Sequence, residues 1–469
     1  MRKRPRLTEQ VPEPEIDSAK NADRGPRLTY EEYRNKRELG LLHENEQSRD
    51  QQKNVLDKTN IAAVKPDANN ADTFKLVITT LEGLEPVLAE ELRLMGAEMI
   101  EIGSRAVICK ANKKFMYRCN LELRTAIRVL KSINTFRVRH ESALYTKMRE
   151  INWAEFLDVD GTLAINAVCF SKYFTHSQYI ALKSKDAIVD QFRDNFGRRP
   201  NVDTIRPKLR INIYMHDDEC EVLLDSSSDP LFKRGYRSET LEAPINEVLA
   251  AGMLKLAGYD GSRPLLDPMC GSGTILTEAA LIAYNIPPQL HRNFFGFTTW
   301  NDFDAKLWKE VIDEAKARII NDKKIEILGF DKDFQAIRVS ERNVESPEMK
   351  GKIIFERKDI NKLEPPVENG MIVTNPPYDE RLEVENIQDF YAELGDIFKK
   401  KFMGYDVWMI SSNESAFKKF GLHPSQKYKL NNGGLDCRFM KFEMYQGSKK
   451  ASKQVTVVIE EEQDEDLKI

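Results

Sequence analysis

The segment 372–378, IVTNPPY, ends an apolar run on an amide, two prolines and a tyrosine. Neither proline has an N–H for a sheet ladder, so we expect the strand to stop here on a rigid backbone. The side-chain oxygen of Asn375 and the carbonyl oxygen of Pro376 can accept the N–H groups of a nucleobase amine, and Pro377 helps to fix them. Tyr378 can stack on a base that has left its own stack. The segment therefore predicts a site that works on an exocyclic amine.

A glycine-rich turn and two aspartates precede that segment, each at the end of a predicted strand. In the turn 267–274, DPMCGSGT, Gly271 and Gly273 let a ligand approach the backbone. The spacing is not GxGxxG and no lysine follows, so phosphate is not the expected ligand. Asp331 could accept ribose hydroxyls, and Asp359 could hold an adenine amino group. Each aspartate alone is more typical of a helix cap or turn, but in this order they predict a nucleoside-binding row.

Predicted strands alternate with predicted helices from residue 229 onward. The strands are RPLLD, KIEILGF, KIIFE, GMIVT, YDVWMISS and CRFMKFEMY. This alternation predicts an α/β domain with a doubly wound, mainly parallel, Rossmann-like sheet. Ligands of such sheets bind at the carboxyl ends of the strands, where the candidate residues stand. A methyl group on a cationic sulfur could be attacked there without a metal or a covalent intermediate, mainly by positioning.

The part of the chain before residue 229 has a different pattern. Residues 73–135 read as strand, helix, strand, strand, then helix and strand, a small α+β unit. Residues 136–228 add a strand, a helix that should stop at Gly197, and two alternating strands. Polar composition predicts disorder for residues 1–72, and the acidic tail 447–469 is expected to be disordered too.

The bulk composition narrows the class of protein. Of the 469 residues, 41% are hydrophobic, enough for more than one core. No apolar run approaches the length of a membrane span, and the basic N-terminus lacks the apolar stretch of a signal peptide. The six cysteines form no CxxC pair and lack a histidine at metal spacing, so we predict no metal site. Reduced cysteines favour a cytoplasmic protein without a membrane partner.

Charge is distributed unevenly along the chain. The formal net charge is −4, but residues 121–210 contain 16 Lys and Arg against 10 Asp and Glu. A basic region within an acidic protein suggests a surface for a polyanion, although a solvated surface without a partner fits the charge equally well.

The combined motifs resemble a known family. The turn 267–274 with Asn-Pro-Pro-Tyr looks like the class I S-adenosylmethionine (SAM) methyltransferases that act on exocyclic amines. The segments LFKRGYR, APINEVLAAGMLKLAGY and NNGGLDCRFMKFEMY are similar to bacterial THUMP-domain enzymes that methylate guanine N2 in 23S ribosomal RNA. The segment SKYFTHSQYIALKSKDAIVDQFR, followed by GRRPNVD, looks like their RNA-binding THUMP domain. The resemblance covers roughly residues 73–446.

The resemblance carries expectations for fold, ligands and residues. It implies a ferredoxin-like unit at 73–135, a THUMP domain at 136–228 and a seven-stranded methyltransferase domain at 229–446. It implies SAM as cofactor, bound by Asp267, Pro268, Cys270, Gly271, Gly273, Thr274, Asp331 and Asp359. It implies the target guanine at Asn375, Pro376, Pro377 and Tyr378. The expected partner is RNA, namely 23S rRNA or its large-subunit precursor, and the candidates for contacts with it are Lys183, Lys185, Arg198, Arg199, Arg234, Tyr236 and Arg237.

Two departures and several alternatives accompany this prediction. The family usually has glycine after the tyrosine, where this chain has Asp379. Some relatives carry a second methyltransferase domain, whereas this chain continues into an acidic tail, so we expect one reaction. A tRNA guanine-N2 enzyme, a DNA adenine-N6 methyltransferase and a non-catalytic RNA-binding factor are the alternatives. The motifs do not predict the oligomeric state.

Overall fold

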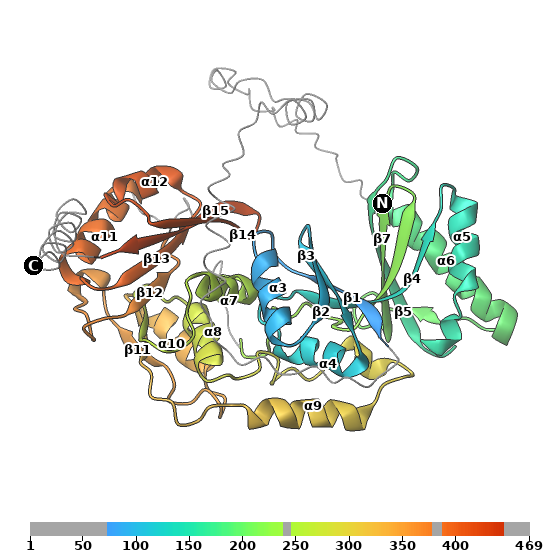
Figure 1. The fold of residues 1–469 in the computed structure, drawn as a ribbon, viewed down its shortest axis with the longest axis horizontal. Helices are drawn as coiled ribbons and strands as arrows, with labels where there is room; N and C mark the ends of the chain where they lie inside the picture. Colours follow the sequence, from blue (N-terminus) through green and yellow to red (C-terminus); the bar gives the residue numbers. More distant parts are fainter. Residues whose placement is uncertain (1–72, 238–244, 378–386, 445–469) are drawn as a thin grey trace, which may run out of the picture. The chain divides into compact units, whose positions relative to one another are not determined.

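The computed structural model describes residues 73–237, 245–377 and 387–444 (Figure 1). The expectations for residues 1–72, for the tail 447–469, for Tyr378 and for Asp379 lie outside these described residues. Within the described ranges, none of the helices is both long enough and apolar enough to cross a membrane.

The N-terminal half forms one continuous eight-stranded sheet. Its strands are β1 (Phe74–Thr79), β2 (Glu98–Gly103), β3 (Ala106–Ala111), β4 (Arg128–Arg137), β5 (Thr162–Phe170), β6 (Asn201–Val202), β7 (Leu209–His216) and β8 (Glu219–Asp225). They lie in the order β2-β3-β1-β4-β8-β7-β5-β6. Strand β4 pairs antiparallel with β1 on one side and with β8 on the other. The expected boundary between residues 135 and 136 falls inside β4, so both N-terminal units share a strand.

Helices α3 (Glu85–Leu94), α4 (Lys113–Glu122), α5 (Glu141–Glu150) and α6 (Ser177–Phe196) belong to this half, with a 3₁₀ turn at η1 (Trp153–Glu155). The side chain of Asn112 caps α4 by accepting from the N–H of Phe115. Helix α6 ends at Gly197, which has a φ of 68° and provides the left-handed stop that the sequence predicts. Helix α5, which packs beside α6, was not anticipated.

The C-terminal half forms a seven-stranded sheet. Its strands are β9 (Leu265–Asp267), β10 (Ile327–Asp331), β11 (Ile354–Arg357), β12 (Met371–Thr374), β13 (Asp406–Ser411), β14 (Gln426–Asn432) and β15 (Leu435–Glu443). The order is β11-β10-β9-β12-β13-β15-β14. The first five strands in this order are parallel, and β15 runs antiparallel to β13 and β14. The predicted doubly wound, mainly parallel sheet is confirmed.

The helices of this half are α7 (Glu247–Leu256), α8 (Thr274–Ala283), α9 (Ala305–Ala317), α10 (Phe334–Asn343), α11 (Ile387–Lys401) and α12 (Glu414–Lys419), with 3₁₀ turns η2 (Gly296–Thr299) and η3 (Ile360–Lys362). Buried residues of α11 and β13 share a core with α12 and β15. Strand β14 and helices α9 and α12 were not named from the sequence.

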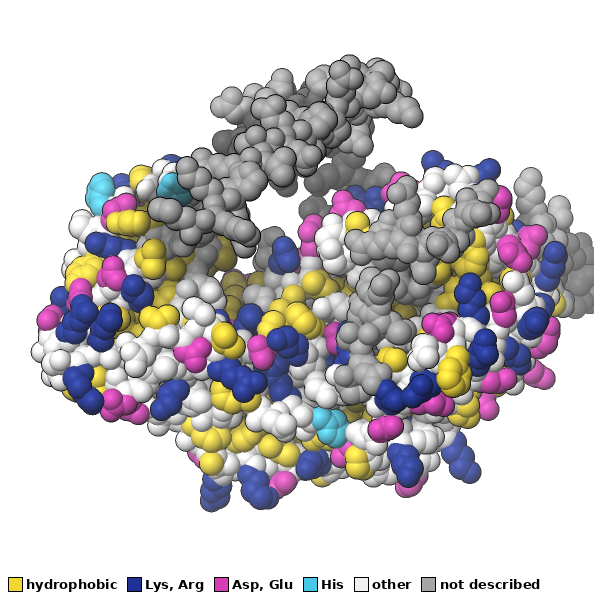
Figure 2. Space-filling view, turned by 180° about the vertical axis from the view of Figure 1, so that it is seen from behind, with side chains coloured by type: hydrophobic (Ala, Val, Ile, Leu, Met, Phe, Trp, Pro, Cys, Tyr) yellow, Lys and Arg dark blue, Asp and Glu magenta, His cyan; other side chains and the backbone are white. Residues whose placement is uncertain are grey.

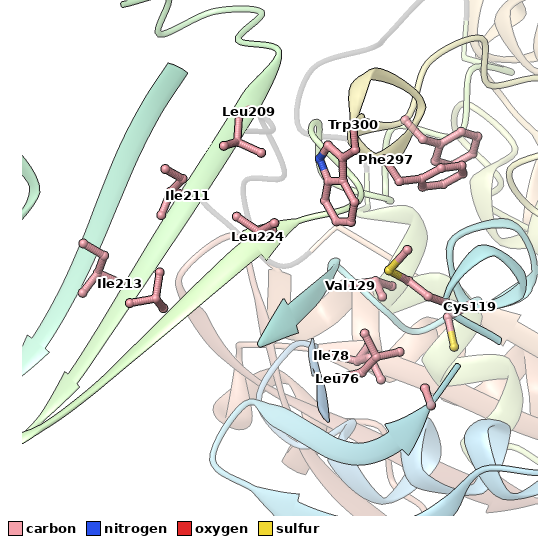
Figure 3. Packing of buried hydrophobic residues seen from close by; sticks show 14 of the residues in the cluster. Leu76, Ile78, Cys119, Val129, Leu209, Ile211, Ile213, Leu224, Phe297 and Trp300 are labelled. Atoms are coloured by element: carbon pink, nitrogen blue, oxygen red, sulfur yellow. The ribbon is translucent and has the colours of Figure 1, made fainter. Parts of the chain in front are cut away.

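The segment around η2 completes the core of the N-terminal half. Phe297 and Trp300 pack with Leu76 of β1 and Leu224 of β8 in one buried cluster (Figure 3). The ring of Phe297 stacks on Tyr117 of α4 with centroids 4.4 Å apart. Aromatic pairs of this kind add to the free energy of burial. The C-terminal half therefore contributes part of the core on which the eight-stranded sheet rests.

Candidate active site

Four neighbouring strands bring the candidate residues to one edge of the seven-stranded sheet. The strands are β11, β10, β9 and β12, in that order, and all are parallel to one another. Asp267 and Asp331 are the last residues of β9 and β10, Asn375 directly follows β12, and Asp359 comes two residues after β11. The carboxyl ends of parallel strands share an edge, so the order predicted along the chain becomes a row in space.

The glycine-rich turn after β9 is fixed by neighbouring side chains. The Oδ2 atom of Asp331 accepts a hydrogen bond from the N–H of Gly271 at 3.0 Å. The hydroxyl of Ser340, on α10, donates to the carbonyl oxygen of Gly271 at 2.7 Å. The side chain of Asn343 donates to the carbonyl oxygen of Ser272 at 3.1 Å. The backbone of the turn is thus held in place before any ligand arrives.

The two glycines of the turn have different roles. Gly273 has a φ of 75°, and a Cβ there would lie 3.1 Å from the ring of Phe355, so close packing requires glycine. Gly271 has a φ of 54°, but a Cβ there would meet no heavy atom within 4 Å. The space beside Gly271 is therefore open to a ligand, while Gly273 serves the fold.

Asp267 is a buried carboxylate without a cation beside it. The residue is 2% exposed, and its Oδ1 atom accepts from the hydroxyl of Thr374 at 2.7 Å and from the N–H of Met269 at 3.2 Å. Burial raises the pKa of Asp267 to about 7, because its effect is larger than the opposing effect of these two hydrogen bonds. Among the described residues, no Lys, Arg or His forms an ion pair with it. Such a carboxylate suits a cationic group that a ligand would bring.

Asn375 presents an unsatisfied acceptor. Its Oδ1 atom is buried and has no hydrogen-bond partner among the described residues. Pro376, which follows, is buried, and Pro377 is half-buried. Leaving a buried acceptor unpaired costs about 1–3 kcal/mol, so a donor from outside the chain would stabilise this position. The structure thus provides an acceptor of the kind that the sequence predicts for an amine.

The remaining residues expected at the cofactor are mostly occupied within the chain. Pro268 is buried, and Cys270 is 7% exposed, with burial raising the pKa of its thiol well above the usual range. The hydroxyl of Thr274 accepts from Arg237 at 2.8 Å. The Oδ1 atom of Asp359 accepts from the N–H of Asn361 at 2.9 Å and caps η3. Their side chains support the turn and strand ends; a contact with ligand stays a prediction.

Arg234, one of the predicted RNA contacts, is buried in the described structure, and its contact with RNA stays a prediction. Its side chain is 0% exposed, forms an ion pair with Glu278 at 3.3 Å, and donates to the carbonyl oxygens of Leu231 and Arg124. The hydroxyl of Tyr236 also donates to Glu278, at 3.0 Å. The segment RGYR is therefore anchored in the interior, because an apolar helix, α8, carries the buried carboxylate that a cation must neutralise.

The other basic candidates lie at the surface of the THUMP-like region or near it. Lys183 is half-buried with its ammonium 5.1 Å from the ring centroid of Tyr145. Lys185 pairs with the neighbouring Asp186, while Arg198 and Arg199 are exposed just after α6. On the face shown in Figure 2, Lys and Arg side chains are interspersed with Asp and Glu. The charge excess of this region does not form one block on that face.

Sequence reasoning missed three residues that shape the site. Thr374 binds Asp267, Ser340 binds the turn, and Glu278 anchors RGYR. Only Glu278 has a clear signal in the sequence, since it is the lone charge in the apolar run TILTEAALIAY. A single carboxylate in such a helix indicates a buried partner elsewhere.

Comparisons with known proteins match three successive parts of the chain. Family models match an RlmL ferredoxin-like domain at residues 75–130, a THUMP domain at 138–225 and an RMKL-like methyltransferase domain at 234–441. A putative RNA methyltransferase from Synechocystis sp. is 36% identical over 383 residues, which are 81% of this chain and 100% of that protein.

A second relative is a ribosomal RNA large subunit methyltransferase K/L from Syntrophotalea carbinolica, 36% identical over 79% of this chain. This chain spans about half the length of that relative, 54%. Among solved structures, a putative methyltransferase complexed with SAH aligns with a TM-score of 0.72 and 28% identity, over 81% of this chain and 100% of that one.

The strand order, the glycine-rich turn and the row of acidic residues define a class I methyltransferase with SAM as its cofactor. A THUMP domain stands in front of it in the chain. The chain belongs to the family of RNA methyltransferases that combine an RlmL-type ferredoxin-like domain, a THUMP domain and an RMKL-like methyltransferase domain. The resemblance read from the motifs is confirmed.

Proposed function

We propose that the chain transfers a methyl group to the exocyclic N2 of a guanine in large-subunit (23S) ribosomal RNA. The observation that carries this proposal is the buried, unpartnered Oδ1 atom of Asn375 beside the cofactor turn. The names of the K/L relatives support the substrate class, and the motif resemblance supports guanine N2. We expect this chemistry in the cytoplasm, as the reduced cysteines suggest.

The residues at the strand ends fit SAM, which supplies an electrophilic methyl group on a cationic sulfur. The carboxylate of Asp267 would pair with a cationic group of the cofactor, and this attraction would offset the burial that raises its pKa. Asp331 retains acceptor capacity for ribose hydroxyls, because its Oδ2 atom takes one backbone N–H and a carboxylate oxygen can accept more. The open space at Gly271 would admit the cofactor against the backbone.

The chain's own contribution to the reaction lies at Asn375. Its Oδ1 atom would accept one N–H of the guanine amine, and the Pro376 carbonyl would accept the other. These two acceptors make the amine nitrogen more electron-rich and aim its lone pair. Two successive prolines keep the acceptors from turning away, which is the positioning that a transfer without a covalent intermediate requires.

The substrate is tested first by nucleoside mass spectrometry on ribosomal and transfer RNA from cells with and without the gene. We expect one N2-methylguanosine to be lost from large-subunit rRNA. Loss from tRNA instead would move the substrate and keep the mechanism. An unchanged RNA profile would leave DNA adenine-N6 methylation, or binding without catalysis, and would overturn the proposal.

Replacement of Asn375 tests the role of its side chain. Asn375→Ala should lower methyl transfer by at least about a hundredfold, which is the usual cost of removing one preorganised hydrogen-bonding group from an active site. Binding of SAM, measured by calorimetry, should stay within about twofold, because the side chain acts on the amine. A parallel fall in SAM affinity would contradict this division of roles.

A further inference from the structure

A second cavity lies beside the proposed active site and contains none of its residues. It has a volume of about 730 Å³, within the range of ligand sites. Its lining combines the loop after β1, the segment RGYR, the start of α7 and the β14–β15 turn, and includes Lys233, Arg237, Glu247, Gly433 and Gly434.

The cavity lies at the same edge of the sheet as Asn375. Strand β13 is parallel to β12, and its last residue, Ser411, pairs with Arg438 of β15. The β14–β15 turn precedes Arg438 on that strand and therefore extends beyond the carboxyl end of β13. Arg237 connects the cavity to the cofactor turn, because it donates to the hydroxyl of Thr274 at 2.8 Å.

The walls of the cavity are rigid. The loop after β1 approaches β14 so closely that a Cβ at Gly83 would lie 2.6 Å from the carbonyl oxygen of Lys429. Leu84 of the same loop fills the space beside Gly252 of α7. The opposite wall is anchored through the buried pair of Arg234 and Glu278. A cavity held in this way does not depend on a ligand for its shape.

The lining favours an anionic, extended ligand. Lys233 is 59% exposed, and its only ion pair among the described residues is with Asp229 at 3.5 Å. The Nε atom of Arg237 is buried without a hydrogen-bond partner, although the Nη2 atom of the same guanidinium pairs with Glu247 at 3.4 Å. At the turn, Gly433 and Gly434 have open space where a Cβ would be, and the N–H of Gly434 donates to the Oδ1 atom of Asn431 at 3.0 Å.

We propose that this cavity binds the RNA strand next to the target nucleotide, with a phosphate near Lys233 and the backbone of the β14–β15 turn. The proposal rests on the proposed function, since it takes RNA as the substrate of Asn375. Phosphate contacts position a strand without reading its sequence. A base that leaves its stack needs its neighbours held, and this cavity lies at that edge of the sheet and contains the exposed Lys233.

The test introduces one charge at the turn and compares it with a neutral residue of the same shape. Gly433 has a φ of 60°, which Asp and Asn tolerate, and its Cβ position is open. Gly433→Asp should weaken binding of in vitro transcribed 23S rRNA about fivefold at low salt, while Gly433→Asn should stay within about twofold of the natural protein. The affinity for SAM should be equal in both variants.

A second comparison avoids the turn altogether. Lys233→Glu should weaken RNA binding about fivefold or more, whereas Lys309→Glu on α9 should leave it unchanged. Both lysines are exposed and have an aspartate four residues away, so the two reversals are matched in local effect.

The outcomes separate this inference from the proposed function. Equal RNA binding by the Asp and Asn variants and by Lys233→Glu would overturn the inference and leave the function standing. A fall in SAM affinity alone would assign the cavity to the cofactor and overturn it too. If the natural protein bound the transcript without methylating it, the proposed function would be overturned. The RNA affinities of the Gly433 and Lys233 variants would still show whether the cavity binds RNA. Binding of neither 23S rRNA nor tRNA transcripts would overturn both.

Discussion

Glu278 and Asp267 are both buried carboxylates, but only Glu278 has a counter-charge among the described residues. Glu278 is 0% exposed, and it receives a guanidinium from Arg234 and a hydroxyl from Tyr236. Asp267 is 2% exposed and receives only a hydroxyl and a backbone N–H. A charge buried for the fold finds its counter-charge within the chain, because an unpaired one would destabilise the protein.

A charge buried for binding can be left incomplete. Asp267 remains without a cation among the described residues, and the Oδ1 atom of Asn375 remains without a donor. Both stand at neighbouring strand ends, β9 and β12. A ligand that brings a cation to Asp267 and a donor to Asn375 would satisfy both groups at this one edge. The comparison predicts that the first kind of charge governs stability and the second governs affinity.

The largest expected effect is a loss of stability when the buried ion pair of Arg234 and Glu278 is broken. Arg234→Ala leaves Glu278 buried without its counter-charge and should lower the free energy of unfolding by about 3–5 kcal/mol. Denaturant unfolding of the full chain measures it. The double variant Arg234→Met with Glu278→Leu should recover most of the loss, because both charges are removed. A loss below about 1 kcal/mol in the single variant would show that the pair is not a structural anchor.

The incomplete carboxylate should behave in the opposite sense. Asp267→Asn removes a carboxyl group whose ionised form is destabilised by burial, so the protein without ligand should become more stable at neutral pH. The affinity for SAM should fall, because the proposed partner of its cationic group is gone. A variant that lost stability and kept SAM affinity would assign Asp267 to the fold.

The pH dependence of this effect has a defined sign. The folded pKa of Asp267 is about 7 and the unfolded one is near 4, so the folded state binds more protons between these values. Stability therefore falls as pH rises from about 4 to 7. The advantage of Asp267→Asn should grow over that window from near zero to at most about 4 kcal/mol. Unfolding curves of both proteins at about pH 4.5, 6 and 7.5, which span this window, measure the difference in their stability.

The row of candidate residues could be predicted from the sequence because it follows from local patterns. Asp267, Asp331 and Asn375 each end a recognisable strand, and the alternation with helices makes those strands parallel. Parallel strands place their carboxyl ends together, so chain order was sufficient. The open side at Gly271 and the close packing at Gly273 needed the tertiary structure, since both are glycines in one turn.

The role of RGYR could not be predicted, because its partner is distant in the chain. Arg234 and Glu278 are 44 residues apart, and a basic segment with an aromatic residue is equally typical of an RNA-binding surface. Strand β14 was missed for a related reason. Lys427 and Lys429 alternate with buried residues on an edge strand, and lysines on such an edge weaken the apolar signal.

The smallest effect on stability is expected where the charged side chains are exposed to solvent. Arg198 and Arg199 are exposed, and the pair of Arg198 with Asp160 is exposed on both sides, so it contributes about 0–1 kcal/mol. Reversing both arginines to Glu should leave unfolding almost unchanged. It should weaken binding to 23S rRNA and flatten the dependence of log affinity on log salt by about 1–2 units, through lost counterion release.

A matched reversal on another surface makes this last prediction specific. Lys306 and Lys309 are exposed on α9, and Lys306→Glu with Lys309→Glu changes the net charge by the same amount. If the salt slope falls only in the Arg198 and Arg199 variant, the contact is local to the end of α6. Equal slopes in both variants would mean that RNA senses only total charge, and the binding surface of the THUMP domain would have to be sought on another face. The contribution of an exposed charge to RNA affinity would then depend on where the RNA lies on the surface. Asp267 differs in this respect, because its burial without a cation already marks the position of its ligand.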